Sequence, residues 1–184
     1  VCDFDPLEKQ FQHSLNAAVV HLQHQDTRIH LIDTPGLPDF IGRAIGALPA
    51  VETAAIVVNA QNGIEMITGR MMQWARKRDL CRMIVVNKID AQGVDLPGLV
   101  AQIQTAFGKE CLPLNLPLSQ PNGGPTQVID CFFNRVGHSD LGSVEAAHRA
   151  LVEQVVEVDG EFVDRYLEAG DIDASELHAP LEQA

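Results

Sequence analysis

The sequence predicts an α/β protein whose mainly parallel sheet is flanked by helices, with a small inserted β-hairpin and helix subdomain. Strand-like apolar runs alternate with segments of helical spacing up to about residue 107, which is typical of parallel strands joined by crossover helices. Two runs, residues 53–60 and 82–87, are almost continuously apolar, as expected of strands covered on both faces. After residue 110 the pattern changes to short runs of period two, which indicates a part of different construction.

The first strands are predicted to form an antiparallel hairpin. Residues 15–24 alternate partly between apolar and polar side chains, and residues 28–33 return after a polar turn at 25–27. Strands joined by so short a connection pair in antiparallel fashion. A helix is then expected to begin near Pro38 and to end before Pro49.

Two longer helices are predicted further along the chain. The first spans roughly residues 65–79, because its apolar residues recur at helical spacing: Ile64, Ile67, Met71, Trp74 and Ala75. We interpret these side chains as core residues and assign no cofactor role to Trp74. The second helix is expected over residues 96–107.

The inserted part is predicted from a second hairpin pattern. Residues 111–119 alternate with period two but contain two prolines, which confines this strand to an edge. Residues 121–125 are a turn signal, and residues 126–133 form the returning strand.

The end of the chain is predicted to be helical. Ser143 opens one long helix, and Gly170 ends it. Asp173 or Ser175 is expected to cap a short last helix.

Composition narrows the class of protein. The 184 residues are 46% hydrophobic, which suits one soluble globular domain, or one domain with an insertion. A formal net charge of −12 argues against broad electrostatic binding of nucleic acid and against sequence-specific DNA binding. One basic cluster is interpreted as a solvated helix face or, alternatively, as a small docking patch: Arg70, Arg76, Lys77, Arg78 and Arg82.

The cysteines and the hydropathy pattern indicate a compartment. The four cysteines are widely spaced without a C-x-x-C pair, which suggests a reducing cytosol and a cytoplasmic protein. No apolar run approaches the ~18 residues needed to span a bilayer, so we expect no membrane partner. The chain begins within an already patterned region at Val1, which suggests a piece of something longer.

The string Asp33-Thr34-Pro35-Gly36 follows a predicted strand, at the end where ligands bind in open α/β sheets. Asp33 can hold Mg²⁺ through a water molecule, and the Gly36 N–H can approach a γ-phosphate because no Cβ stands in the way. This pattern is weak by itself, since an ordinary strand-to-helix turn also produces it.

The string Asn87-Lys88-Ile89-Asp90 is more specific. The Asp90 carboxylate can accept hydrogen bonds from both the N1–H and the exocyclic amine of guanine, a pairing that adenine cannot offer. Asn87 would tie the loop to its neighbours, and the Lys88 stem would cover the flat ring. The alternative is a charged loop with Asn and Asp in turn positions.

With both motifs in this order, the chain resembles the GTP-binding domain of translational GTPases, specifically elongation factor G or an elongation factor G-like paralogue. That fold is a P-loop-NTPase-like sheet. The resemblance rests on 14–19, 26–36, 38–40, 60–63, 85–90, the hairpin at 111–133 and 161–170. It divides the chain into a partial GTP-binding domain (1–108), an inserted subdomain (109–160) and a helical return (161–184).

The resemblance also implies a site. Ser14 and Asp33 would hold Mg²⁺, Asp33 and Gly36 would serve the phosphates and the switch, and Asn87, Lys88 and Asp90 would bind guanine. GTP or GDP with Mg²⁺ would be the cofactor and the ribosome the partner, with hydrolysis coupled to elongation or recycling.

Four departures from the family pattern bear on this function. The family's phosphate loop, G-x-x-x-x-G-K-S/T, and its strand would precede Val1 and are missing, and the chain ends before the last guanine-contacting loop. The family's Arg-Gly-Ile-Thr is Phe11-Gln12-His13-Ser14 here. Leu37 occupies the position of the water-positioning histidine, and leucine cannot hydrogen-bond water, so no catalytic residue is assigned.

These departures leave two functions open. Hydrolysis is expected to be slow unless another group such as His13 replaces Leu37, although an exposed histidine without a role is the more ordinary interpretation. The alternative to a GTPase is a non-catalytic nucleotide-binding or ribosome-interaction module, and the isolated 184 residues are expected to bind GTP poorly.

Overall fold

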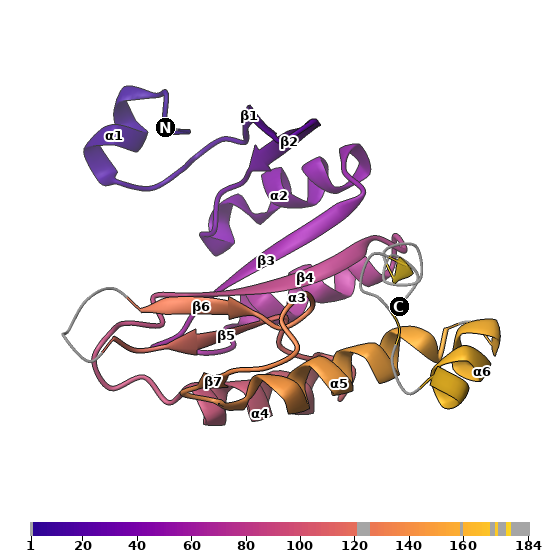
Figure 1. The fold of residues 1–184 in the computed structure, drawn as a ribbon. Helices are drawn as coiled ribbons and strands as arrows, with labels where there is room; N and C mark the ends of the chain where they lie inside the picture. The colour runs from indigo at the N-terminus through magenta and orange to yellow at the C-terminus, as the bar shows by residue number, and fades with distance from the viewer. Residues whose placement is uncertain (1, 121–125, 159, 170–171, 173–175, 178–184) are drawn as a thin grey trace. The chain divides into compact units, whose positions relative to one another are not determined.

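The computed structural model describes residues 2–120, 126–158, 160–169, 172 and 176–177 (Figure 1). The chain divides into two compact units. The N-terminal unit comprises Val1–Val58 and Ile64–Val85, and the C-terminal unit comprises Asn59–Gly63 and Val86–Ala184. Within the described residues, no helix is both long and apolar enough to cross a membrane.

The N-terminal unit contains the predicted hairpin. Strands β1 (Ala18–His24) and β2 (Thr27–Asp33) are antiparallel, and Ala18 faces Asp33 at the open end. The hairpin prediction is confirmed, although β1 begins three residues later than expected.

A short helix precedes this hairpin and was not expected from the sequence. Helix α1 (Pro6–Phe11) has Asp5 as its N-cap and Glu8 as the second half of a capping box. Proline at the first helical position costs no hydrogen bond, because that N–H is unpaired in any helix. The spacing of Asp5, Pro6 and Glu8 was the signal that could have revealed it.

The segment after β2 is helical, as predicted, but it is not one regular helix. A 3₁₀ turn, η1 (Pro38–Phe40), leads into α2 (Ile41–Ala47), and a second 3₁₀ turn, η2 (Leu48–Ala50), follows it. The second turn carries Pro49, which removes a backbone donor at that point.

A β-α-β unit follows, formed by β3 (Thr53–Asn59), α3 (Met66–Arg76) and β4 (Cys81–Asn87). The strands β3 and β4 pair in a parallel sheet, and the Cys81 amide donates to the Glu52 carbonyl at the start of the pair (3.1 Å). The parallel α/β class predicted from the alternation of strands and helices is therefore confirmed.

The core beside this sheet contains the C-terminal part of the predicted apolar stripe of α3. Ala75 is fully buried with Leu48 and Ala54, and Met71 and Trp74 pack against this cluster. The interpretation of Trp74 as a core side chain is therefore confirmed.

The prediction that both strands are covered on both faces is wrong for the described residues. Along β3, buried residues alternate with exposed ones, and Val57 is 61% exposed. On β4, Met83 and Val85 are also exposed. The reason is that the cluster around Ala54 and Ala75 covers the face of β3 that carries Ala54, whereas the alternate residues of β3 are exposed.

The C-terminal unit begins with α4 (Leu96–Phe107), which has the predicted bounds and Asp95 as its N-cap. Strands β5 (Asn115–Leu118) and β6 (Gln127–Asp130) form the predicted antiparallel hairpin. The predicted turn at 121–125 lies outside the described residues.

Two further strands and two helices complete the described part of this unit. The short strands β7 (His138–Ser139) and β8 (Gly142–Ser143) were not predicted, and they lead directly into α5 (Val144–Val156). Helix α6 (Gly160–Ala169) follows after a break.

The prediction of one long helix from Ser143 is therefore wrong, although Ser143 is the N-cap of α5, as expected. At the break the Val158 amide donates to the Val155 carbonyl (3.4 Å), three residues back, which tightens the last turn. Gly160 then begins α6, and glycine is a poor residue for a helix interior. The predicted roles of Gly170, Asp173 and Ser175 lie outside the described residues.

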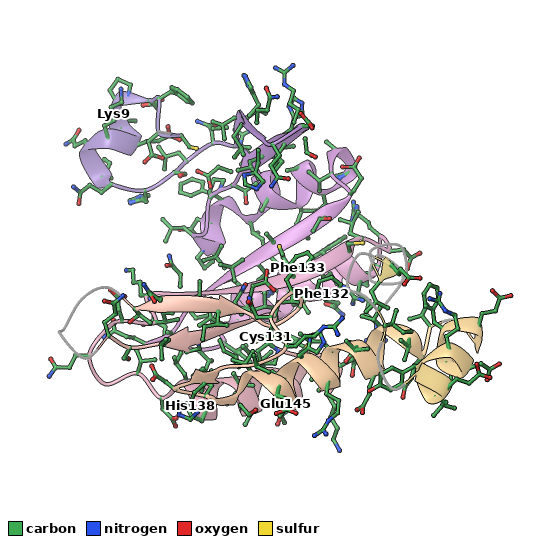
Figure 2. The ribbon with its side chains drawn as sticks, viewed as in Figure 1. Lys9, Cys131, Phe132, Phe133, His138 and Glu145 are labelled. Carbon is green, nitrogen blue, oxygen red and sulfur yellow. The ribbon has the colours of Figure 1, made fainter. Side chains whose placement is uncertain are left out.

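Two apolar clusters contain residues of α5, and Figure 2 labels one member of each, Cys131 and Phe132. The first cluster contains Leu116, Cys131, Val144 and Leu151. The second contains Phe132, Val152, Val155, Val156, Ile172 and Leu177. These contacts make the hairpin and α5 one packed body.

Candidate nucleotide-binding site

The turn after β2 exposes the groups that the sequence assigned to a phosphate and a metal. Asp33 ends the strand with an exposed side chain, and Pro35 is buried beneath the turn. Gly36 is exposed, and a Cβ added there would meet no atom within 4 Å. The space beside Gly36 is therefore open, so a ligand could approach its backbone closely.

Residues near the start of the chain contact both predicted metal ligands. The Ser14 hydroxyl donates to the Asp3 carboxylate (2.9 Å). Burial, together with a hydrogen bond to the Asp33 carboxylate, raises the pKa of the Cys2 thiol. Cys2 bonds to Asp33, and its neighbour Asp3 bonds to Ser14. Ser14 and Asp33 therefore lie at the same end of the hairpin.

The donor types suit a hard cation. A serine hydroxyl and a carboxylate are oxygen ligands of the kind that Mg²⁺ prefers. The Ser14 proton is directed to Asp3, which leaves the oxygen lone pairs available for a cation. Within the described residues, no three His, Cys, Asp or Glu side chains form a metal-binding group. Phosphate and water oxygens would have to supply the remaining ligands.

The Asn87-Lys88-Ile89-Asp90 string forms a tight turn after β4. The Asn87 side-chain oxygen accepts from the Lys88 amide (2.9 Å), and Lys88 has a left-handed backbone with φ of 58°. The Ala91 amide closes the turn on the Lys88 carbonyl (3.1 Å). The side chains of Asn87, Lys88 and Asp90 are all exposed.

A second loop, residues 59–63, supports this turn. The Ala60 amide donates to the Asn87 carbonyl (2.9 Å), and the Gln61 side chain donates to the Gln92 carbonyl (3.2 Å). Gly63 closes the supporting loop by donating to the Asn59 carbonyl (2.9 Å), with φ of 71°. The main chain of Asn87, rather than its side chain, is thus bonded to the neighbouring loop.

The two groups of residues belong to different units. Ser14, Asp33 and Gly36 lie in the N-terminal unit, whereas Asn87, Lys88 and Asp90 lie in the C-terminal unit. Each motif begins at the last residue of a strand, Asp33 of β2 and Asn87 of β4, which is the strand end that the sequence predicted.

The two residues considered for water positioning are both exposed. The Leu37 side chain is 41% exposed at the start of η1. The His13 Nδ1 lies 2.9 Å from the Phe11 carbonyl oxygen, and its ring lies 6.0 Å from the Phe11 ring. His13 therefore contacts Phe11 through both its Nδ1 atom and its ring.

One residue was missed by the sequence reasoning. The Glu8 carboxylate is buried and accepts four backbone hydrogen bonds, two of them from residues 15 and 16, which adjoin Ser14. These hydrogen bonds, chiefly those from Leu15 and Asn16, lower the pKa of Glu8.

A β-α-β unit with an Asp-x-x-Gly turn and an Asn-Lys-x-Asp turn, each after a strand, defines the class of the protein. It is an α/β nucleotide-binding domain of the P-loop GTPase type. The sequence matches the family model described as the elongation factor Tu GTP binding domain over residues 1–174. The chain therefore belongs to this family of translational GTPase domains, which bind guanine nucleotides.

Curated relatives agree with this assignment. The chain is 32% identical over 193 residues to an elongation factor G-like protein of two Mycobacterium tuberculosis strains, covering 100% of the chain and 27% of the relative. It is 27% identical over 190 residues to an elongation factor G-like protein of Thermotoga maritima, covering 98% and 28%. The chain thus spans about a quarter of the length of these relatives.

Two solved structures are similar to the fold. A crystal structure of a Thermus thermophilus protein has a TM-score of 0.82 and 28% identity, covering 97% of the chain and 29% of that protein. A crystal structure of a bacterial selenocysteine-specific elongation factor has a TM-score of 0.51 and 25% identity. This second match covers 58% of the chain and 20% of the factor.

Proposed function

We propose that the chain is the guanine-nucleotide-binding part of an elongation factor G-like translational GTPase. The protein would act on the ribosome in the cytoplasm and couple GTP hydrolysis to elongation or recycling. Residues 1–108 would bind the nucleotide, 109–160 would form the inserted subdomain, and 161–184 would return toward the nucleotide domain. Family membership and the relatives named elongation factor G-like support this proposal.

The observation that carries the proposal is the exposed turn at residues 87–90. Its backbone is held by the 59–63 loop and by the bond from the Lys88 amide to the Asn87 side chain. Asp90 is therefore presented to solvent from a constrained turn, with its carboxylate available for two donors on one ligand. Guanine offers two adjacent donors, its N1–H and its exocyclic amine, and adenine does not.

On the phosphate side, Asp33, Gly36 and Ser14 would act together. Mg²⁺ would be held by the Ser14 hydroxyl and, through water, by Asp33, and it would neutralise phosphate charge. The Gly36 amide would meet the γ-phosphate and would lose this contact when the phosphate leaves.

Nucleobase selectivity in the full-length protein tests this proposal. We expect GDP to bind more tightly than inosine diphosphate by about tenfold, because inosine lacks the exocyclic amine and each hydrogen bond to a charged group contributes about 1.5–3 kcal/mol. ADP should bind more weakly still. Asp90→Asn should lower GDP affinity at least about tenfold and favour xanthosine diphosphate, whose carbonyl can accept from the new amide.

Asp26→Asn is the matched control, since Asp26 is another exposed aspartate in a turn, at the tip of the β1–β2 hairpin. It makes the same chemical change and should leave the GDP affinity unchanged. Equal affinities for GDP and ADP in the unmodified protein would refute the proposal.

A second candidate function rests on Leu37. An exposed apolar side chain occupies the position where the family resemblance implies a water-positioning histidine. The protein would then be a non-catalytic, or very slow, guanine-nucleotide-binding or ribosome-interaction module. Single-turnover assays with bound GTP distinguish the two: tight binding without phosphate release supports the module, and release stimulated by ribosomes supports the GTPase.

A further inference from the structure

The Glu8 carboxylate connects two segments that are about ten residues apart in the chain. Its Oε2 atom accepts from the amides of Phe4 (3.1 Å) and Asp5 (3.0 Å). Its Oε1 atom accepts from the amides of Leu15 (2.8 Å) and Asn16 (3.0 Å). The side chain is only 4% exposed, so water does not compete freely for these oxygens. We call this carboxylate and its four amides the Glu8 latch.

The latch does more than a helix cap requires. A capping box needs one bond from the side chain to the N-cap amide, and the bond from Asp5 provides it. The bonds from Leu15 and Asn16 come from beyond the end of α1, and they add nothing to the helix itself. Burying a carboxylate costs free energy unless its oxygens accept hydrogen bonds. Here the hydrogen bonds come from residues on both sides of α1, so they close the loop between residues 4–5 and 15–16.

The closed loop carries the Ser14 hydroxyl. Ser14 immediately precedes Leu15, and its proton is donated to Asp3, which immediately precedes Phe4. The segments 3–5 and 14–16 are therefore joined by two neighbouring side-chain contacts, one from Asp3 and one through Glu8. A hollow of about 380 Å³ lies beside these two segments, and its lining includes Cys2, Phe4 and Asn16.

We propose that Glu8 is a positioning residue for nucleotide-state sensing, which holds the loop closed so that Ser14 presents its oxygen in one place. This inference rests on the proposed function, because it takes Ser14 to be the Mg²⁺ ligand in the GTP state. The Glu8 oxygens are already bonded to four amides, so in this proposal Glu8 acts through Ser14 rather than as a ligand itself. It holds residues 14–16 in one conformation before GTP binds. The binding step then does not have to include the entropic cost of ordering this segment.

The test uses Glu8→Gln in the full-length protein. Glutamine keeps the size of the side chain but replaces one acceptor oxygen with an NH₂ group, so two of the four amides face a donor. The matched control is Lys9→Gln, which changes an exposed neighbour on the same helix without touching the latch; Figure 2 labels this lysine on α1.

Two measurements are made on each variant. Hydrogen exchange of the Leu15 and Asn16 amides reports on the latch without any nucleotide. The ratio of GTP to GDP affinity with Mg²⁺ reports on the positioning of Ser14, because the proposal assigns Ser14 to the Mg²⁺ ion of the GTP state. A purely structural role would lower both affinities together.

We expect Glu8→Gln to accelerate exchange at both amides and to weaken GTP binding about tenfold, within the usual range of coupling between sites, with GDP affinity unchanged. Lys9→Gln should change neither. Unchanged exchange would overturn the latch, and equal losses for GTP and GDP, or no loss, would overturn the positioning role. Failure of the unmodified protein to bind any guanine nucleotide would instead refute the proposed function, and the exchange measurement would still decide the latch.

Discussion

The packing of α5 against the β5–β6 hairpin can be tested with two identical substitutions. Leu151 lies on α5, is 5% exposed, and packs in the cluster with Leu116 and Cys131. Leu167 lies on α6 and is 75% exposed. The two changes, Leu151→Ala and Leu167→Ala, remove the same atoms from a helix, so their difference measures burial alone.

The expected magnitude follows from these exposures. Leucine to alanine removes three carbon atoms, and at about 0.8 kcal/mol for each buried carbon the transfer cost at Leu151 is about 2.4 kcal/mol. The cavity left in the cluster raises this to about 3–4 kcal/mol, within the range measured for such changes. At Leu167 the loss should stay within about 0.5 kcal/mol, because the side chain is already in water.

Urea unfolding followed by far-ultraviolet circular dichroism measures this difference. With an m-value of about 2 kcal/mol per molar, Leu151→Ala should lower the transition midpoint by about 1.5–2 M. Leu167→Ala should lower it by about 0.25 M or less. Equal midpoints for the two variants would refute the packing of Leu151 in the core, and so would a large loss at Leu167 alone.

Three further predictions concern the site and its surroundings. Leu37→His should raise single-turnover GTP hydrolysis about 10²-fold or more at unchanged GTP affinity, and no increase would remove Leu37 as the cause of slow turnover. Because the pKa of Glu8 is lowered in the folded state, its ionised form stabilises the fold above about pH 4.3, and this contribution disappears as the pH falls through the folded pKa. The stability difference between the protein and Glu8→Gln should therefore shrink in acid, and a constant difference would contradict this. Burial raises the pKa of the Cys131 thiol, so iodoacetamide should alkylate exposed Cys81 first, whereas prior labelling of Cys131 without denaturant would contradict its burial.

The sequence predicted the elements that depend on local pattern. The β1–β2 hairpin was predicted apart from the start of β1, and α4 has the expected bounds, because a short polar turn and a helical apolar period are properties of neighbouring residues. The N-cap role of Ser143 was predicted for the same reason. The single helix expected after it was wrong, because α5 ends at Glu157 and a second helix begins at Gly160, a poor helix former.

The assigned site could be predicted only in part. Both motifs were recognised because their residues are contiguous, and the structure places each directly after a strand. The loop at 59–63 that supports the Asn87 turn was not recognised as part of the site, because its bonds join residues that are far apart in the chain: Ala60 with Asn87, and Gln61 with Gln92. Such pairings leave no periodic signal in a single sequence.

The sequence by itself determined the family, the parallel α/β class and the two motifs, since each is encoded in short contiguous strings or in local periodicity. Only the tertiary structure decided that Val57 and Val85 are exposed, that Ser14 is held by Asp3, and that the Glu8 carboxylate closes the loop. These features depend on which distant backbone groups meet in space. A buried carboxylate is stable only where enough amides converge on it, and the folded chain alone brings those amides together.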